Sequence, residues 1–210
     1  MKYLTYLVKV AIFIYSTNSV AALIDVDWKT NGDSLIIKDT ETALQWLSLS
    51  ETADISYNDV VTNLGEDGVY QGFRLATQSE VLQLWNNAGI TNTEREWVTD
   101  QFVPVKNLVD RLGPTLMVEP GLFTFATHTI GLVEGGPDLS NNERWAMELT
   151  YANDDLSTRT SSHHYTWDVS SVNPHYSTYL VQAVPIPAAV WLFYSGFIGL
   201  FVVVKRKHCG

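Results

Sequence analysis

Three histidines late in the sequence carry the side chain that most often binds metal ions in proteins. His163, His164 and His175 could supply imidazole ligands, and the carboxylate of Asp168 is close to them along the chain. Adjacent residues of a strand point to opposite faces of a sheet, so His163 and His164 could bind one ion together only across a bend. We therefore expect no metal ion here and interpret these histidines as part of a solvated loop or strand edge.

A second group of residues offers the oxygen ligands that calcium binds. Asn153, Asp154 and Asp155 are consecutive, and Glu148 precedes them. Asn and Asp side chains in a turn also bind their own backbone, which explains such a run without a metal ion. The run predicts a turn, and we expect no cofactor.

The sequence lacks the motifs of common enzymes. It contains no HExxH, GxSxG, P-loop, GxGxxG, CxxC or calcium-loop pattern, which argues against zinc proteases, serine hydrolases and nucleotide-binding enzymes. Two carboxylates facing each other in a cleft need no such motif, so catalysis by paired carboxylates stays open.

Charge is distributed unevenly along the 210 residues. All 23 acidic residues lie between Asp25 and Asp168, and the same stretch holds 8 of the 13 basic residues, an excess of 15 negative charges. Nucleic acid is a polyanion, so we expect none among the partners of this stretch. The one cysteine, Cys209, lies outside it, so no disulfide can stabilise it.

The first 22 residues have the order of a secretory signal peptide. Lys2 and Lys9 accompany an apolar run over residues 10–15. Small residues follow at Val20, Ala21 and Ala22. We expect cleavage after Ala21 or Ala22, with an uncleaved N-terminal anchor as the alternative. The apolar run is shorter than the roughly 20 residues of a membrane-spanning helix, which favours cleavage.

An uncharged stretch near the C-terminus predicts a membrane-spanning helix. Residues 188–204 carry no charge and are followed by Lys205, Arg206 and Lys207. The positive-inside rule puts these basic residues in the cytoplasm and residues 22–184 across the membrane, where the signal peptide would also send them. A buried core helix is the alternative, but it does not explain the basic residues.

A proline-containing segment joins this helix to the preceding domain. Its sequence is Val184-Pro185-Ile186-Pro187-Ala188. Proline has no backbone N–H and biases the residue before it to an extended conformation, so the segment should remain accessible to a processing enzyme. Together with the apolar helix and the basic end, the segment resembles the VPxPA variant of the PEP-CTERM sorting signal.

This resemblance implies a location and a partner. It implies a Gram-negative bacterium that makes exopolysaccharide, and an exosortase-type transpeptidase that recognises residues 184–188, cleaves near them and passes the exported domain to the cell surface or the medium. The implied organisation is a signal peptide over residues 1–22, a secreted domain over 23–183 and a sorting signal over 184–210.

Residues 23–183 have the pattern of one α+β domain whose helices lie toward its front. Ser56 with Asp59, and Thr77 with Glu80, predict the starts of two helices that end at Gly65 and Gly89. A third helix is expected over 100–112. Strands are expected over 34–39, 43–47, 122–130, 145–151, 165–169 and 179–184.

Residues 39–90 resemble a segment common in the exported domains of PEP-CTERM proteins. More distantly, they are similar to the D-x-x-T-G-L-x-W and G-W-R-L-P-T patterns of bacterial domains with a C-type-lectin-like fold, which implies that fold here. Ala43 and Phe73 stand where those patterns usually have Gly and Trp. Glu119-Pro120-Gly121 is similar to the Glu-Pro-Asn of calcium-dependent lectins but lacks the Asn, so we expect no such sugar site.

Arg74 and the large aromatic residues are further candidates for binding. Arg74 is expected to pair with Asp39 or Glu80 and so attach a helix to the sheet, with anion binding as the alternative. Exposed aromatic rings could stack on sugars, although a domain without disulfides needs most of its rings in the core. The rings are those of Trp85, Trp97, Tyr151, Tyr165, Trp167 and Tyr176.

The sequence therefore predicts an exported surface or matrix protein that an exosortase processes. Its domain is expected to have a non-enzymatic binding or structural role, and the resemblance implies a link to exopolysaccharide. One alternative is an exopolysaccharide-acting enzyme that uses paired carboxylates. Another is a single-pass membrane protein that keeps its C-terminal helix.

Overall fold

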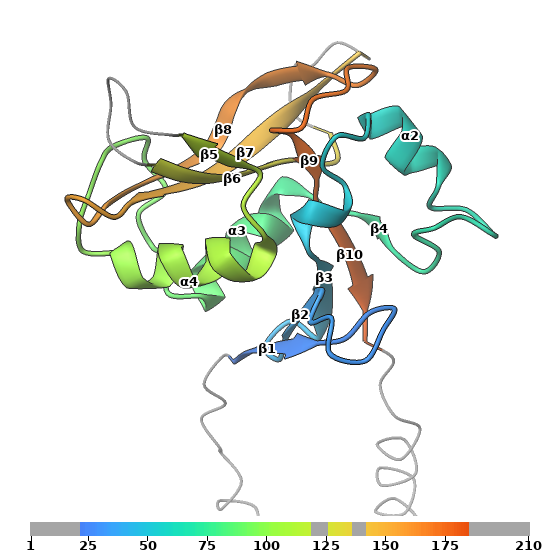
Figure 1. Ribbon diagram of the computed structural model, residues 1–210, viewed down its shortest axis with the longest axis horizontal. Helices are drawn as coiled ribbons and strands as arrows, with labels where there is room; N and C mark the ends of the chain where they lie inside the picture. The colour runs from blue at the N-terminus through green and yellow to red at the C-terminus, as the bar shows by residue number, and fades with distance from the viewer. Residues whose placement is uncertain (1–21, 119–125, 136–141, 185–210) are drawn as a thin grey trace, which may run out of the picture.

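Two β-sheets organise the protein, for which a computed structural model describes residues 22–118, 126–135 and 142–184. The first sheet has the order β1-β2-β3-β10-β4, with β1 (Leu23–Val26), β2 (Ile36–Asp39), β3 (Leu44–Leu47), β10 (Leu180–Ala183) and β4 (Arg74–Leu75). The second has the order β5-β6-β7-β8, with β5 (Leu116–Val118), β6 (Ala126–Leu132), β7 (Glu143–Ala152) and β8 (Ser157–Asp168), and β9 (Ser177–Thr178) pairs with β6. The fold is thus mixed α+β, as the sequence predicts, and strands predominate in its described residues (Figure 1).

The last strand of the first sheet is a central one. Val181 of β10 is opposite Trp46 of β3 on one side and Arg74 of β4 on the other, and both pairings are antiparallel. Gln182 and Gln45 share a hydrogen bond of 2.7 Å although they are 137 positions apart. The sheet is therefore completed only by the end of the described chain.

The predicted helix starts are confirmed for α2 (Tyr57–Thr62) and α3 (Gln78–Asn87). The Ser56 hydroxyl accepts from the Asp59 backbone N–H, and Thr77 and Glu80 form a reciprocal capping box. α2 ends earlier than predicted, because its C-cap is Asn63 and not Gly65. Two smaller differences from the prediction concern the third predicted helix and a short helix after β3. α4 (Phe102–Leu112) begins two residues after the predicted start, and a short 3₁₀ helix, η1 (Leu49–Glu51), follows β3.

Arg74 pairs with Glu80, so one of its two predicted partners is correct. Arg74 Nη1 lies 2.9 Å from Glu80 Oε2, and the Thr77 backbone N–H donates to the same oxygen at 2.9 Å. The Arg74 guanidinium, with help from Thr77, lowers the pKa of the Glu80 carboxyl to about 2 from its usual 4.5. The other predicted partner, Asp39, is buried, and its carboxylate instead accepts hydrogen bonds from the Thr42 hydroxyl and from Asn87 Nδ2.

The lowered pKa of Glu80 predicts how acid weakens this contact. The ion pair stabilises the folded state above pH 4.5, and this contribution is lost as the pH falls toward about 2. Glu80→Gln should therefore lower the free energy of unfolding at pH 7, by about 1 kcal/mol or less because Arg74 is half exposed, and change it little at pH 2.5. Urea unfolding at both pH values measures this, with the exposed Glu96→Gln as the control. An equal loss at both values would contradict it.

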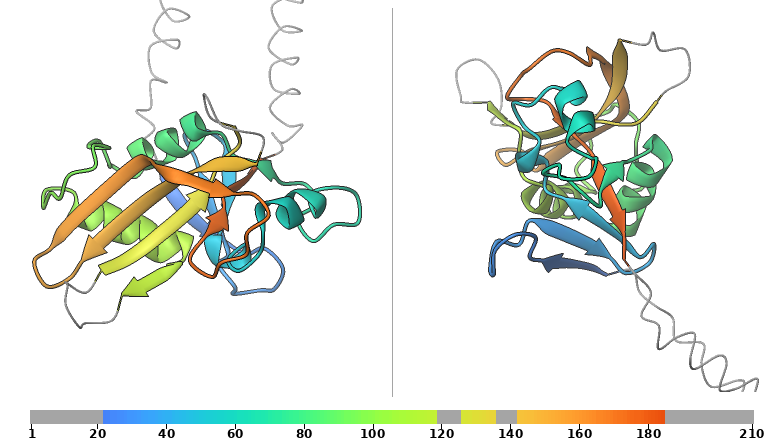
Figure 2. Two further views of the ribbon diagram at one scale, coloured as in Figure 1. Left: turned by 90° about the horizontal axis from the view of Figure 1, so that it is seen from above. Right: turned by 90° about the vertical axis from the view of Figure 1, so that its right-hand side faces the viewer.

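The main hydrophobic core lies between the two sheets and the helices α3 and α4. It contains Trp46 and Val181 from the first sheet, Trp85 from α3, Leu108 from α4 and Leu149 from the second sheet. Figure 2 (left) shows β6, β7 and β8 side by side, with α4 packed behind them. A second cluster, on the other face of the first sheet, is formed by Ile36, Leu47, Val60, Tyr70, Phe73 and Leu180.

A close approach inside this core involves Gly131 and Tyr179. The ring of Tyr179 packs edge-on against Trp46, with centroids 6.4 Å apart, and the residue is 1% exposed. A Cβ atom at Gly131 would lie 2.5 Å from two carbons of that ring. The ring of Tyr179 therefore leaves no space for a side chain at position 131.

β8 is longer than the sequence predicts. The prediction covered 165–169, but the strand begins at Ser157, and its first half is rich in Ser and Thr. These hydroxyls are buried and bonded, since Thr158 donates to the Val98 carbonyl at 3.2 Å and Thr160 to the Asn92 carbonyl at 2.7 Å. The sequence did not predict this half of the strand, because the partners of its polar residues are distant along the chain.

Candidate functional site

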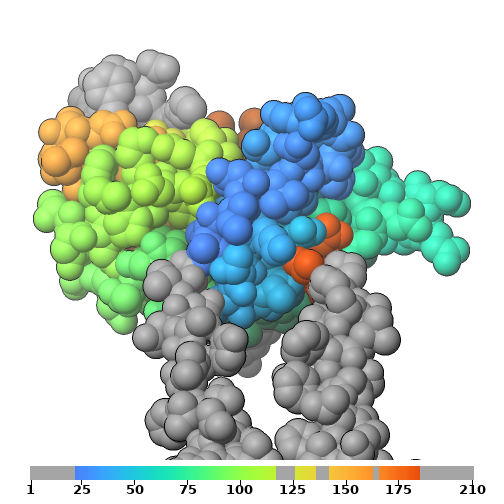
Figure 3. All heavy atoms as spheres, turned by 90° about the horizontal axis from the view of Figure 1, so that it is seen from below, coloured from blue at the N-terminus to red at the C-terminus, as the bar shows by residue number. Residues whose placement is uncertain are grey.

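Both ends of the described domain lie at the turn between β2 and β3. The Ala22 N–H donates to Thr40 Oγ1 at 3.0 Å, and the Thr40 N–H donates to the Ala22 carbonyl at 3.1 Å. At the other end of this turn, the Val184 N–H donates to the Ala43 carbonyl at 2.9 Å. Figure 3 views the face on which β1 and the end of β10 lie together.

The turn is built around the buried carboxylate of Asp39. One oxygen accepts from the Glu41 backbone N–H at 2.9 Å, and the other accepts from the Thr42 hydroxyl and from Asn87 Nδ2, both at 2.8 Å. Asn87 is the last residue of α3, so the same carboxylate attaches the turn to that helix. The position of both chain ends is therefore fixed by one buried acid.

Ala43 adopts a backbone conformation that favours glycine. Its φ is +54°, in the left-handed region, where a Cβ atom costs energy. Ala43 also stands where the patterns that this segment resembles usually have Gly. Glycine would adopt this conformation at lower cost than alanine.

We expect Ala43→Gly to stabilise the protein. Relief of the left-handed strain outweighs the extra freedom of glycine in the unfolded chain, for a net gain of about 0.5–1 kcal/mol. Denaturant unfolding measures the change. Ala88→Gly is the matched control, because Ala88 has φ −76° in the right-handed region and should lose stability instead. Equal effects at the two positions would contradict the strain at Ala43.

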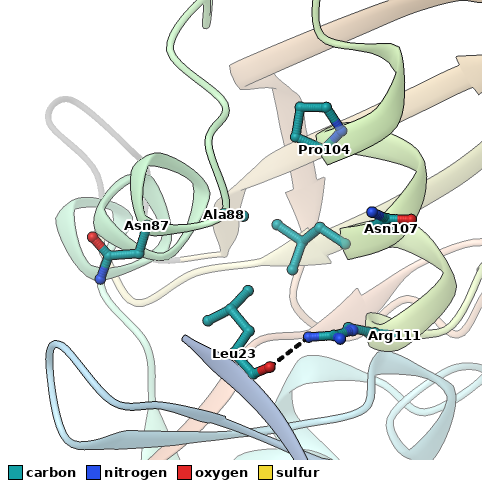
Figure 4. Close-up of a pocket in the computed structure, with 7 residues that line it drawn as sticks. Leu23, Asn87, Ala88, Pro104, Asn107 and Arg111 are labelled. Atoms are coloured by element: carbon teal, nitrogen blue, oxygen red, sulfur yellow. Dashed lines mark hydrogen bonds between the residues drawn. The ribbon is translucent and has the colours of Figure 1, made fainter. Parts of the chain in front are cut away.

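A shallow pocket of about 200 Å³ lies beside the first strand (Figure 4). It is lined by Leu23, Asn87, Ala88, Pro104, Asn107, Leu108 and Arg111. Arg111 Nη1 donates to the Leu23 carbonyl at 2.7 Å, and its Nε lies 3.6 Å from Asp25 Oδ1. Arg111 thus attaches α4 to β1, and Asn87 is bonded to the Asp39 carboxylate, so both polar side chains already have partners within the protein.

A buried ionic cluster lies on the second sheet. Glu148 Oε1 is 2.6 Å from His128 Nδ1, 2.8 Å from Thr150 Oγ1 and 3.4 Å from Arg159 Nη2. The Glu148 side chain is 3% exposed. Thr150 is opposite His128 in β6 and Arg159 in β8, so the cluster crosses three strands on the face opposite the α4-packed core.

Glu148 Oε1 thus contacts the imidazole of His128, the hydroxyl of Thr150 and the guanidinium of Arg159. Glycoside hydrolysis by paired carboxylates needs a second carboxyl group about 5–9.5 Å away, with space for the substrate between them. A carboxylate this deeply buried and bonded is better suited to joining the strands. The sequence did offer a signal that we missed, because an acid between Met147 and Leu149 in an apolar strand predicts buried partners.

The metal candidates are not brought together in the described part of the chain. There, no three His, Cys, Asp or Glu side chains are placed to hold an ion. Asp155 accepts from the Ser157 backbone N–H at 2.9 Å, which is the turn expected for residues 153–155. His175 is exposed, and the side chains of His163 and His164 lie outside the described residues. Glu119 to Gly121 lie outside them as well.

The aromatic candidates divide between core and surface. Trp85 and Tyr151 are buried, as expected for most of them, whereas Trp97 is 47% exposed. Trp167 and Tyr176 stack on each other at 4.0 Å and are half-buried. The side chain of Tyr165 lies outside the described residues.

The predicted sorting residues are only partly described. Ala22 and Val184 have the contacts given above. The other predicted residues of the signal cleavage region, the sorting motif and the basic end lie outside the described ranges: Val20, Ala21, Pro185, Ile186, Pro187, Ala188, Lys205, Arg206 and Lys207. Among helices in the described ranges, none has the length and apolar content to cross a membrane, and the predicted helix over 188–204 is outside them.

Comparisons with family models, with curated proteins and with solved structures found no match for this chain.

Proposed function

We propose that this protein is exported, sorted through its C-terminal segment and processed by an exosortase-type transpeptidase. Its domain then works outside the inner membrane of a Gram-negative bacterium by binding, without catalysis. The observation that supports this best is the shared position of Ala22 and Val184 at the β2–β3 turn. A domain with both ends on one face can fold while its two terminal segments are still held at a membrane.

The end of β10 supports cleavage of a folded domain. Val184 makes the last backbone hydrogen bond of the described chain, to the Ala43 carbonyl. Pro185 and Pro187 have no N–H with which to extend the pairing. Under this proposal the processing enzyme recognises the prolines after Val184 and leaves the pairing of β10, including the Val184–Ala43 bond, intact.

We also propose that the domain is a single C-type-lectin-like unit. The residues that carry the resemblance have structural roles: Asp39 holds the turn, Trp46 and Phe73 are buried, and Thr77 caps α3. Such residues support a shared fold. They carry no information about the ligand, because these four side chains bond or pack within the domain.

The proposal is tested by the intact mass of the mature protein from the cell envelope and from the medium of its native host, with and without the exosortase. We expect loss of the residues up to Ala21 or Ala22, and loss of the residues after the 184–188 segment only when the enzyme is present. Cys209 leaves with that second segment. A mass that keeps the C-terminal segment in both strains would overturn sorting and indicate a single-pass membrane protein.

A further inference from the structure

Trp97 is the large aromatic side chain that the described structure leaves most exposed. It is 47% exposed and lies in the connection between α3 and α4. Burial of an indole ring is strongly favourable, so a tryptophan that stays outside the core needs a reason. A mobile loop would supply one, but this connection is held in place.

Hydrogen bonds fix the connection on both sides of Trp97. Val98 pairs with Thr158 of β8 through two backbone bonds, of 2.9 and 2.7 Å. On the other side, the buried side chain of Gln101 accepts from the Thr91 and Asn92 backbone N–H groups, both at 2.7 Å. The connection therefore holds the indole in place beside β8, the last strand in the order of the second sheet.

A guanidinium lies over the indole ring. The Arg159 guanidinium carbon is 5.3 Å from the centre of the Trp97 ring, and Arg159 Nη2 reaches Glu148 Oε1 at 3.4 Å. The Arg159 side chain is 23% exposed, and within the described residues Glu148 takes one of its five N–H donors. The surface thus combines an apolar ring face with hydrogen-bond donors, while Glu148 balances the positive charge.

We propose that Trp97 and Arg159 form a binding surface for an uncharged sugar chain. The C–H face of a pyranose ring would pack on the part of the indole that Arg159 leaves exposed, and its hydroxyl groups would accept from the Arg159 guanidinium. Glu148 acts as a positioning residue, because it holds Arg159 beside the ring. The inference deepens the proposed binding role and rests on it.

The charge of the domain selects among sugar chains. Residues 25–168 carry an excess of 15 negative charges, so a polyanionic chain such as a polyuronate would be repelled as it approached. Arg159 offers little net attraction to an acid, because Glu148 already neutralises it. A neutral polysaccharide is not repelled by the acidic domain and needs no net positive charge to bind, so its binding should change little with salt concentration.

Affinity electrophoresis of the full chain in mild detergent tests this surface, with a polysaccharide cast into the native gel. The probes are dextran, hydroxyethyl cellulose and galactomannan as neutral chains and alginate as the acidic chain. We expect at least one neutral chain to retard the protein and alginate not to. Trp97→Ala should weaken the retarding interaction roughly tenfold, and Trp97→Phe should keep most of it.

The controls separate the surface from stability and from sorting. Val103→Ala removes another exposed apolar side chain, 64% exposed on α4, and should bind as the original protein does. Melting temperatures of all variants should agree within a few degrees. Retardation by alginate alone, by none of the chains, or equally for Trp97→Ala and the original protein would overturn the sugar surface. None of these outcomes depends on exosortase processing, which the mass measurement tests separately.

Discussion

Gly131→Ala is expected to lower the free energy of unfolding by about 3 kcal/mol, the upper part of the range for overpacked cores. The added Cβ would lie 2.5 Å from Tyr179 Cδ2 and Cε2, well inside van der Waals contact. The tyrosine cannot retreat easily, because its backbone N–H donates to Leu132 and its carbonyl accepts from Ala76. Trp46 closes the space on the ring's edge.

Urea unfolding followed by tryptophan fluorescence measures this loss. Gly65→Ala is the matched control, because its Cβ would have nothing within 4 Å, and it should change stability little. Tyr179→Leu in the Gly131→Ala background should recover part of the loss, since the two positions are in contact and their effects should not add. If Gly131→Ala and Gly65→Ala unfolded at the same urea concentration, the close approach would be disproved.

Glu148→Ala should have an effect of similar size, about 3 kcal/mol. The substitution removes the acceptor that His128, Thr150 and Arg159 share, and leaves a guanidinium in a mostly buried position with its charge unbalanced. The cost of the unpaired groups exceeds the benefit of the pair itself, because the surroundings stay poorly solvated. Glu148→Gln keeps the shape and one acceptor oxygen, so it should lose less.

Thermal and urea unfolding check this prediction, with Glu143→Ala as the control on the same strand. Glu143 is half-buried at the start of β7, away from the cluster, and its substitution should cost no more than about 0.5 kcal/mol. Arg159→Met in the Glu148→Ala background should restore stability, because it removes the unbalanced charge while keeping the bulk. Equal stabilities of Glu148→Ala and Glu143→Ala would show that the cluster contributes nothing.

Short-range features of this fold could be predicted from the sequence. Ser56 and Thr77 each bond a group three residues away, so their capping roles follow from local spacing alone. Glu80 was one of the two expected partners of Arg74, because Arg74 lies just before the capped helix that contains Glu80. The α+β class followed in the same way, from the period of apolar residues in each segment.

Contacts between distant segments could not be predicted in this way. The place of β10 between β3 and β4 depends on which hydrophobic faces meet, and a single sequence does not specify that. Glu148 was considered with its neighbours Asn153 to Asp155, whereas two of its partners, His128 and Arg159, come from other strands. The Ser- and Thr-rich half of β8 pairs with β7, and its Thr158 and Thr160 hydroxyls donate to the α3–α4 connection, which is far away along the chain.

The central position of β10 also determines how the domain would respond to mechanical force. Any tension transmitted through the residues after Val184 enters the fold at β10, which is hydrogen-bonded to β3 on one side and to β4 on the other. In antiparallel pairs these bonds are perpendicular to the strands, so a pull along β10 loads them together in shear and does not open them one at a time. The domain is therefore built to resist extraction from the end by which it would be tethered, since β10 lies inside the sheet and not at its edge.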